Sequence, residues 1–423
     1  MRQTERDEAV SNDAVPVAEV PVGEVSGAAV SGSAVSGPAV FGAVFGAAVS
    51  GAAVSNAAVS GSSAPGGPSL GPGEPARPPR SRPRPLPWLL GATAVLVATV
   101  LVAVTIGSAD LGVGEVWRSV AWHLARGLGV DHLITVEPLS VLRDGIVWQL
   151  RLPRVLTAAA VGAGLALCGV VMQSLTRNPL ADPYLLGLSS GASLGAVLVL
   201  VLGLGVLLPV AAFAGAVLAL AAALGLAGAL GAITPTRTVL SGLAVSQLCA
   251  AATSFVIFWS ATGDSYREIL SWLMGSVAGA TWGSVAIAGI AVLVLGSVLA
   301  LSGSVLDAFT FGDSSAAALG ISVERTRWLL LVGVALLTGA LVSVSGAVGF
   351  VGLILPHAVR LLTGARHRLL LPLSALTGAS FLVWADTLAR TVFAPREVPV
   401  GIITAAVGAP VFAALLWRGR RLA

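Results

Sequence analysis

Side chains that could carry chemistry are few in this chain, and the usual catalytic combinations are missing. Its 24 basic residues are all arginine, because the sequence contains no lysine. This excludes a Walker A lysine for nucleotide phosphates and a Schiff-base lysine. No His-Glu-x-x-His pattern occurs, and His357 has no second histidine or cysteine at ligand spacing, so no metal site is expected. The sequence predicts a protein that is not an enzyme by itself.

Composition explains why reactive side chains are scarce. Hydrophobic residues make up 56% of the 423 positions, charged residues only 10%, and the mean hydropathy is +0.92. Soluble domains carry about 25% charged residues, so an integral membrane protein is indicated. The net charge of +4 does not indicate nucleic-acid binding, because the arginines are scattered at the ends of apolar segments.

The apolar segments predict an all-α integral membrane protein with ten transmembrane helices. A bilayer core of about 30 Å requires about 20 apolar residues in a helix. The expected spans are residues 88–106, 152–174, 184–203, 207–230, 238–260, 282–302, 327–348, 350–363, 369–389 and 400–417. The eighth is short and contains Pro356, so we expect it to be broken or partly re-entrant.

Two segments outside the spans have distinct compositions. Residues 1–87 are rich in Ala, Val, Ser and Gly and are expected to be a disordered tail before a membrane domain at 88–423, because they cannot bury enough apolar area. Residues 107–150 are expected to form an amphipathic outer segment, with Val116, Trp117, Val120 and Leu124 on its apolar side.

Charge predicts the orientation of the spans. Arg77, Arg80, Arg82 and Arg84 directly precede the first span, which places the N-terminus in the cytoplasm by the positive-inside rule. Ten spans return the C-terminus to the same side. We therefore expect a multi-pass protein of the cytoplasmic membrane with both termini cytoplasmic.

Acidic residues are nearly absent from the expected spans. Asp386 is the only one, and it lies one turn from the outer end of its span. Ion-coupled transporters normally keep an ionisable group near the middle of the membrane. An ion-coupled secondary transporter of a polar solute is therefore disfavoured, but it stays the alternative.

Several longer motifs go beyond generic membrane character. They are the run Arg-Leu-Pro-Arg through Asn-Pro-Leu-Ala-Asp-Pro-Tyr-Leu-Leu-Gly at 151–187, Gly-Phe-Val-Gly-Leu-Ile-Leu-Pro-His-Ala-Val-Arg at 349–360, Trp-Ala-Asp at 384–386, Pro-Val-Gly-Ile-Ile-Thr at 399–404 and Gly-Ala-Pro-Val-Phe at 408–412. Together they resemble the FecCD-type, BtuC-like permease subunits of ABC importers for iron-siderophores, haem and vitamin B12. The resemblance covers roughly residues 88–423.

This resemblance implies the type II ABC importer permease architecture and a set of partners. They are a second permease copy or a homologous permease, two ATPase subunits, an extracytoplasmic substrate-binding protein and membrane lipid, without nucleic acid. No cofactor is expected on this chain, because ATP and Mg belong to the partner ATPase. The implied function is import of a metal chelate, most often an iron-siderophore, by ATP-driven alternating access.

The resemblance also implies roles for three arginines. Arg151, Arg154 and Arg390 match outer arginines that receive acidic residues of the binding protein. A guanidinium group can pair bidentately with a carboxylate. The alternative is that these arginines extend to lipid headgroups.

Two further sites are implied on the cytoplasmic side. The segment from Leu306 to Arg327 matches short helices that couple to the ATPase, and its candidate residues are Leu306, Asp307, Phe311, Gly312, Asp313, Leu319 and Gly320. Thr234, Pro235 and Thr236 match the inner gate. An ordinary helix N-cap explains these three residues equally well.

Overall fold

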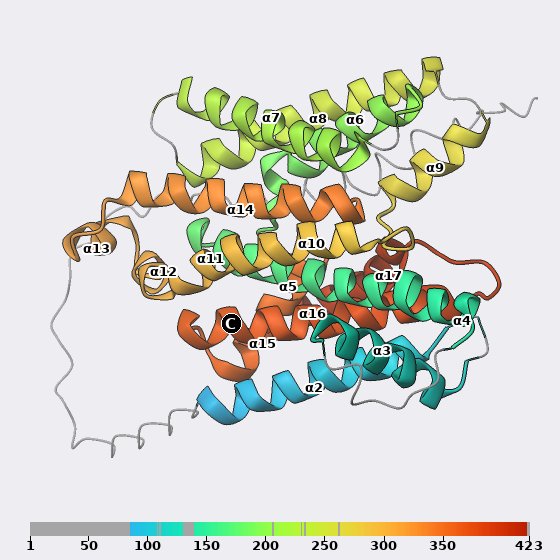
Figure 1. Cartoon of the computed structure of the whole chain (residues 1–423). Helices are drawn as coiled ribbons and strands as arrows, with labels where there is room; N and C mark the ends of the chain where they lie inside the picture. Colours follow the sequence, from blue (N-terminus) through green and yellow to red (C-terminus); the bar gives the residue numbers. More distant parts are fainter. Residues whose placement is uncertain are drawn as a thin grey trace, which may run out of the picture. The chain divides into compact units, whose positions relative to one another are not determined.

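The structure is a computed structural model that describes residues 85–107, 109, 111–129, 139–204, 207–229, 231, 234–260 and 263–420. Regular structure in these ranges is helical throughout (Figure 1). The segment expected as a tail at 1–87 lies outside the described residues except for its last three. Nothing here therefore tests the expected tail.

The ten expected spans all correspond to helices, but they differ in length. Seven helical segments are long and apolar enough to cross a membrane, namely α2 (Pro85–Thr105), Val141–Leu175, α7 (Leu208–Ala229), Thr236–Ser260 of α8 (Pro235–Ser260), Trp282–Leu301, α14 (Val323–Ser345) and α16 (His367–Thr391). Three are shorter, namely α6 (Leu188–Val201), α15 (Val351–Thr363) and α17 (Val400–Arg420), of which Val400–Leu415 is the apolar part. The prediction of a ten-helix membrane protein thus becomes seven full-length spans and three shorter helices.

Two helix starts differ from the expectation. α2 begins at Pro85 rather than at Trp88, because proline lacks only an N–H that the first turn leaves unpaired anyway. The second span begins at Val141 instead of Leu152. There α4 (Val141–Gly145), the π-helix η2 (Ile146–Arg151) and α5 (Leu152–Leu175) follow one another without a break.

The expected break at Pro356 is absent, so that part of the prediction was wrong, whereas the partly re-entrant course stays a prediction. α15 is one continuous helix of 13 residues with Pro356 inside it. At 1.5 Å per residue it is about 20 Å long, too short for a hydrocarbon core of about 30 Å. Its short length therefore comes from its ends and not from the proline.

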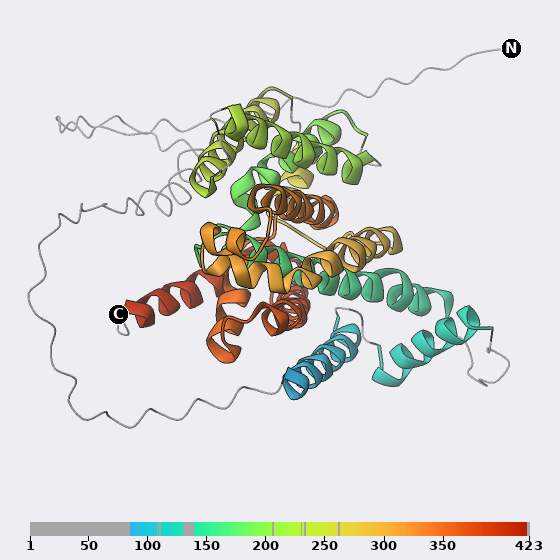
Figure 2. The same ribbon diagram turned by 90° about the vertical axis from the view of Figure 1, so that its left-hand side faces the viewer.

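Helix α5 forms the core of the protein. Of the most apolar 18 residues in the segment Val141–Leu175, which includes α5, 78% are buried, whereas the corresponding share in α2 is 17%. Helix α5 contacts α16, α14, α15 and α10 (Trp282–Ala291). α6, α7 and α8 contact one another and lie together in a separate layer, which α14 joins to the rest through α7 (Figures 1 and 2).

Close contacts between glycines bring α5 against its neighbours. A Cβ atom on Gly162 would overlap the carbonyl oxygen of Gly378 in α16, and one on Gly169 would overlap that of Gly352 in α15. Lipid supplies no hydrophobic drive for helix association, so such helices depend on close backbone contact. These glycines set the distances between α5, α15 and α16.

The outer segment contains an amphipathic helix, α3 (Val113–Gly127), as predicted. Val116 and Val120 are buried, whereas Leu124 on the same apolar side is 55% exposed. His123 stacks on Trp148 of η2 and hydrogen-bonds Asp144 of α4 at 2.8 Å. A polar contact with α4 and ring stacking on η2 therefore help to fix α3.

Other short elements complete the chain. They are the 3₁₀ turn η3 (Pro183–Leu186), α9 (Gly263–Leu273), the π-helix η5 (Val292–Gly296), α11 (Ser297–Leu301), α12 (Gly303–Thr310) and α13 (Asp313–Ala318).

The glycine contact can be tested by adding single methyl groups. We expect Gly162→Ala to lower the free energy of unfolding by about 1–3 kcal/mol, because the methyl group forces α5 away from α16. Gly91→Ala in α2 is the matched control, since its Cβ would meet no heavy atom within 4 Å. SDS titration in mixed micelles measures both, and equal stabilities would contradict the assigned role of the glycine pair.

Candidate functional site

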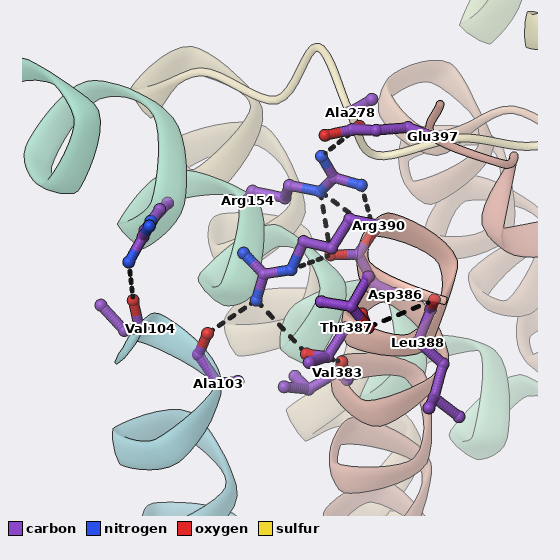
Figure 3. A network of polar contacts seen from close by, with 12 residues as sticks. Ala103, Val104, Arg154, Ala278, Val383, Asp386, Thr387, Leu388, Arg390 and Glu397 are labelled. Atoms are coloured by element: carbon purple, nitrogen blue, oxygen red, sulfur yellow. Dashed lines mark hydrogen bonds and ion pairs between the residues drawn. The ribbon is translucent and has the colours of Figure 1, made fainter. Parts of the chain in front are cut away.

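The N-terminal end of α5 and the C-terminal end of α16 meet around one buried ion pair (Figure 3). Arg154 Nε donates to both carboxylate oxygens of Asp386, at 3.0 and 2.9 Å, and its Nη2 donates to Oδ1 at 2.9 Å. Arg154 is 7% exposed and Asp386 is 1% exposed. Two buried charges are tolerated only when paired in this way.

A second carboxylate reaches the same guanidinium group from the connection between α16 and α17. Glu397 Oε2 accepts from Arg154 Nη1 at 2.7 Å. The Glu397 side chain is 42% exposed, whereas that of Arg154 is 9% exposed. Glu397 thus links the buried pair to the surface.

Arg390 and Arg151 bind the C-terminal end of α2. Arg390 Nη2 donates to Ala103 O at 2.6 Å, and its Nε lies 3.9 Å from Asp386. Arg151 donates to Thr105 O at 3.0 Å and to Ala109 O at 2.6 Å. Cations are stabilised there because the last carbonyls of a helix are unpaired and partly negative.

The three expected docking arginines therefore gather at one end of the bundle, which we call the arginine end. They are buried, with 5%, 7% and 5% exposed for Arg151, Arg154 and Arg390. Asp386, Glu397 and carbonyl groups at the end of α2 and at Ala109 already surround them. Whether they dock a partner stays a prediction.

Charge at the arginine end does not cancel. Asp386 and Glu397 face three guanidinium groups, and Arg151 has no carboxylate partner among the described residues. Counted over the residues that the structure describes, one positive charge is in excess there. Such a charge favours a further acidic group.

At the other end of α5 lie the two short helices α12 and α13, in the segment that was expected to contain coupling helices. Phe311 and Leu319 are 79% and 71% exposed, whereas Leu306 is fully buried. Gly312 and Gly320 have φ values of +102° and +80°, which favour glycine. The segment thus presents apolar side chains outward while it stays attached to the bundle.

Two acidic residues attach this segment. Asp313 accepts from Arg327 Nη2 of α14 at 2.8 and 2.9 Å. Asp307 accepts from His367 of α16 at 2.7 Å. The resemblance suggested Asp307 and Asp313, but not their partners Arg327 and His367.

The expected gate residues lie at the start of α8. Thr234 Oγ1 accepts from the backbone N–H of Arg237 at 3.3 Å, and Thr238 donates to Thr234 O. Thr234 and Thr236 are exposed. This geometry is that of an N-cap, and the gate role stays a prediction, as does that of Pro235.

The described residues contain no group of three His, Cys, Asp or Glu side chains that could hold a metal ion. His357 lies in α15 without a hydrogen-bond partner for Nδ1. The structure therefore offers no ligand set within those ranges.

The two carboxylates on Arg154 should differ in importance. We expect Asp386→Asn to cost about 3–5 kcal/mol of folding free energy, because it leaves a buried guanidinium group without its main partner. Glu397→Gln is the matched neutralisation on the same group and should cost less than about 1 kcal/mol, since Glu397 is partly exposed. SDS titration of both variants measures the difference, and similar losses would refute this ranking.

Comparison with known proteins places these features in a family. Residues 95–418 match the FecCD transport family. The cobalamin import system permease BtuC of Halobacterium salinarum is 41% identical over 361 residues, covering 79% of this chain and 96% of that protein. The Fe(3+)-citrate import system permease YfmD of Bacillus subtilis is 40% identical over 317 residues, covering 70% and 92%.

A solved structure supports the same assignment. An inward-facing structure described as a metal-chelate type ABC transporter has a TM-score of 0.66 and 32% identity, covering 78% of this chain and 98% of that one. The match includes the arginine end and the α12–α13 segment. The chain belongs to the FecCD transport family.

Proposed function

We propose that this protein is the transmembrane permease subunit of a binding-protein-dependent ABC importer and works by alternating access. The observation that carries the proposal is the FecCD match across residues 95–418, with relatives that are named import permeases. The α12–α13 segment supports it, because exposed Phe311 and Leu319 on anchored helices suit a protein partner.

The proposed assembly contains more chains than this one. Two permeases, either two copies or one copy with a homologue, would pair in the cytoplasmic membrane with both termini in the cytoplasm. Two ATPase subunits would bind ATP and Mg and dock at α12 and α13. The absence of lysine from this chain supports a separate site of ATP hydrolysis.

We propose a metal chelate as cargo, with an iron-siderophore as the first candidate. The 40% identity to a Fe(3+)-citrate permease supports iron. The 41% identity to a cobalamin permease favours cobalamin as the second candidate. Both are large polar solutes.

An ion-coupled secondary transporter is the alternative class. Such a transporter would use Asp386 to carry charge. That carboxylate is 1% exposed and held by three hydrogen bonds from Arg154. A permanently paired group is poorly suited to binding and releasing an ion.

Energy coupling tests the proposal. We expect proteoliposomes with the permease, its ATPase and its binding protein to take up ferric hydroxamate, ferric citrate or cyanocobalamin only when ATP is enclosed with the ATPase. An ATPase variant without its Walker lysine is the control and should abolish uptake. Uptake driven by a proton gradient, with no ATPase present, would instead establish the secondary transporter.

The excess charge at the arginine end supports docking of an acidic binding protein, with Arg151, Arg154 and Arg390 as the receiving group. We expect Arg151→Gln to weaken binding of the substrate-binding protein about tenfold, the cost of one charge-assisted hydrogen bond. Surface plasmon resonance on permease in nanodiscs measures this affinity.

Arg118→Gln is the matched control, because Arg118 is exposed on α3. The double variant Arg151→Glu/Arg154→Glu should also lose docking, but it breaks the Asp386 pair as well. Unchanged affinity in Arg151→Gln, with Arg118→Gln also unchanged, would remove Arg151 from the docking site.

A further inference from the structure

Three helices meet through one histidine at the end of the bundle that carries α12. His367 is the first residue of α16 and is 1% exposed. Its Nδ1 lies 2.7 Å from Asp307 Oδ1 in α12, and its Nε2 lies 2.5 Å from Ser174 Oγ in the last turn of α5. One imidazole ring therefore contacts α12 and α5 at once.

The contact with α12 has a second component. Asp307 Oδ1 also accepts from the backbone N–H of His367 at 3.0 Å. The N-cap residue of α16, Arg366, makes no side-chain capping hydrogen bond. Asp307 thus supplies the carboxylate that the start of a helix favours, so α12 provides the cap of α16.

The packing around this cap is close. A Cβ atom on Gly303, the first residue of α12, would lie 3.4 Å from the carbonyl carbon of His367. α12 contacts both α5 and α16. The histidine contacts thus form the polar part of a tight three-helix junction.

Ser174 contacts His367, which contacts Asp307, as in the Ser-His-Asp triad of a hydrolase. The surroundings do not suit catalysis. Ser174 is 4% exposed. Its Oγ lies 2.8 Å from Val170 O and 2.5 Å from His367 Nε2. A nucleophile must be reachable by substrate, and this buried hydroxyl is not.

We propose that His367 is a positioning residue that transmits movement of α12 to α5 during transport. This proposal rests on the function proposed above, in which an ATPase docks at α12 and α13. Displacement of α12 reaches α5 through Asp307, the imidazole ring and Ser174. The other anchor, Asp313 with Arg327, leads to α14 instead.

Two matched variants at the end of α5 test the contact between His367 and Ser174. Ser174→Ala removes the hydroxyl that contacts His367. Thr176→Ala is the control, because Thr176 Oγ1 makes the same kind of bond to a preceding carbonyl, Met172 O at 2.7 Å, with no contact to His367 in the structure. Both variants lose one hydroxyl from the same helix end.

Two substitutions separate the contact of His367 with Asp307 from its contact with Ser174. His367→Asn places an amide nitrogen near the position of Nδ1, so it can still donate to Asp307 but cannot reach Ser174. His367→Gln reaches further, toward Ser174. If His367 only caps and packs α16, His367→Asn should behave as wild type.

The readout is an ATP-driven distance, which needs no knowledge of the cargo. Spin labels at Leu142→Cys in α4 and Trp259→Cys in α8, both 76% exposed, are placed in a background in which Cys168 and Cys249 are alanine. The permease with its ATPase in nanodiscs is measured by electron paramagnetic resonance before and after trapping with ATP and vanadate. Co-purification of the ATPase is measured for every variant.

We expect Ser174→Ala, His367→Asn and His367→Gln to retain the ATPase and the wild-type melting temperature within a few degrees. The fraction of molecules that shift on trapping should fall about fivefold in each, as expected for loss of one buried hydrogen bond. Thr176→Ala should shift as the wild type does.

The possible failures are distinguishable. A wild-type permease that binds no ATPase, or that shows no shift, refutes the proposed function and this proposal with it. A normal wild-type shift that persists in Ser174→Ala and His367→Asn refutes the role of His367 alone. Equal losses in Ser174→Ala and Thr176→Ala also refute it, since the effect would then belong to the helix end in general.

Discussion

The close packing of α5 against α16 is the constraint on which the rest of the structure depends. Gly162 and Gly378 allow the two backbones to touch, and Gly169 with Gly352 does the same between α5 and α15. Lipid is as apolar as the helix surfaces, so the hydrophobic effect does not drive these helices together. Close backbone packing over a long interface supplies the attraction instead. The same closeness brings Arg154 to Asp386 at one end and Ser174 to His367 at the other.

The charged groups that contact α5 or its neighbours in this core lie at these two ends for an energetic reason. A charged pair costs several kcal/mol to desolvate, and the cost falls where one partner keeps contact with solvent. Glu397 and Asp307 are such partners, with side chains 42% and 38% exposed. Arg151 and Arg390 lower the cost further by satisfying the last carbonyls of α2. Between Arg154 and Gln173, α5 contains no charged side chain and one hydroxyl, that of Thr157.

The sequence predicted the positions of the helices better than their limits or their contacts. Apolar length is a local property, so each of the ten expected spans overlaps a helix. The continuity of α4, η2 and α5 was missed because residues 107–150 were assigned to a separate outer segment. The break at Pro356 was expected from a local rule that this short helix does not follow. Side-chain contacts were harder to predict than helices, because Asp386 is 232 residues from Arg154 and His367 is 193 residues from Ser174. Resemblance grouped the three arginines, but neither it nor any local pattern could indicate their burial.

The geometry of α5 bears on the proposal that this chain contacts partners on opposite sides. Its 24 residues form a rod about 36 Å long at 1.5 Å per residue, and α16, α14, α15 and α10 contact it. A helix held by so many neighbours resists bending, so under that proposal a displacement at Ser174 would reach Arg154 as movement of the whole rod. The regular hydrogen-bond pattern changes at its borders, where η2 precedes it and the turn at Asn178 follows it. Such movement would be absorbed at these borders, next to the arginine end and next to the α12 junction.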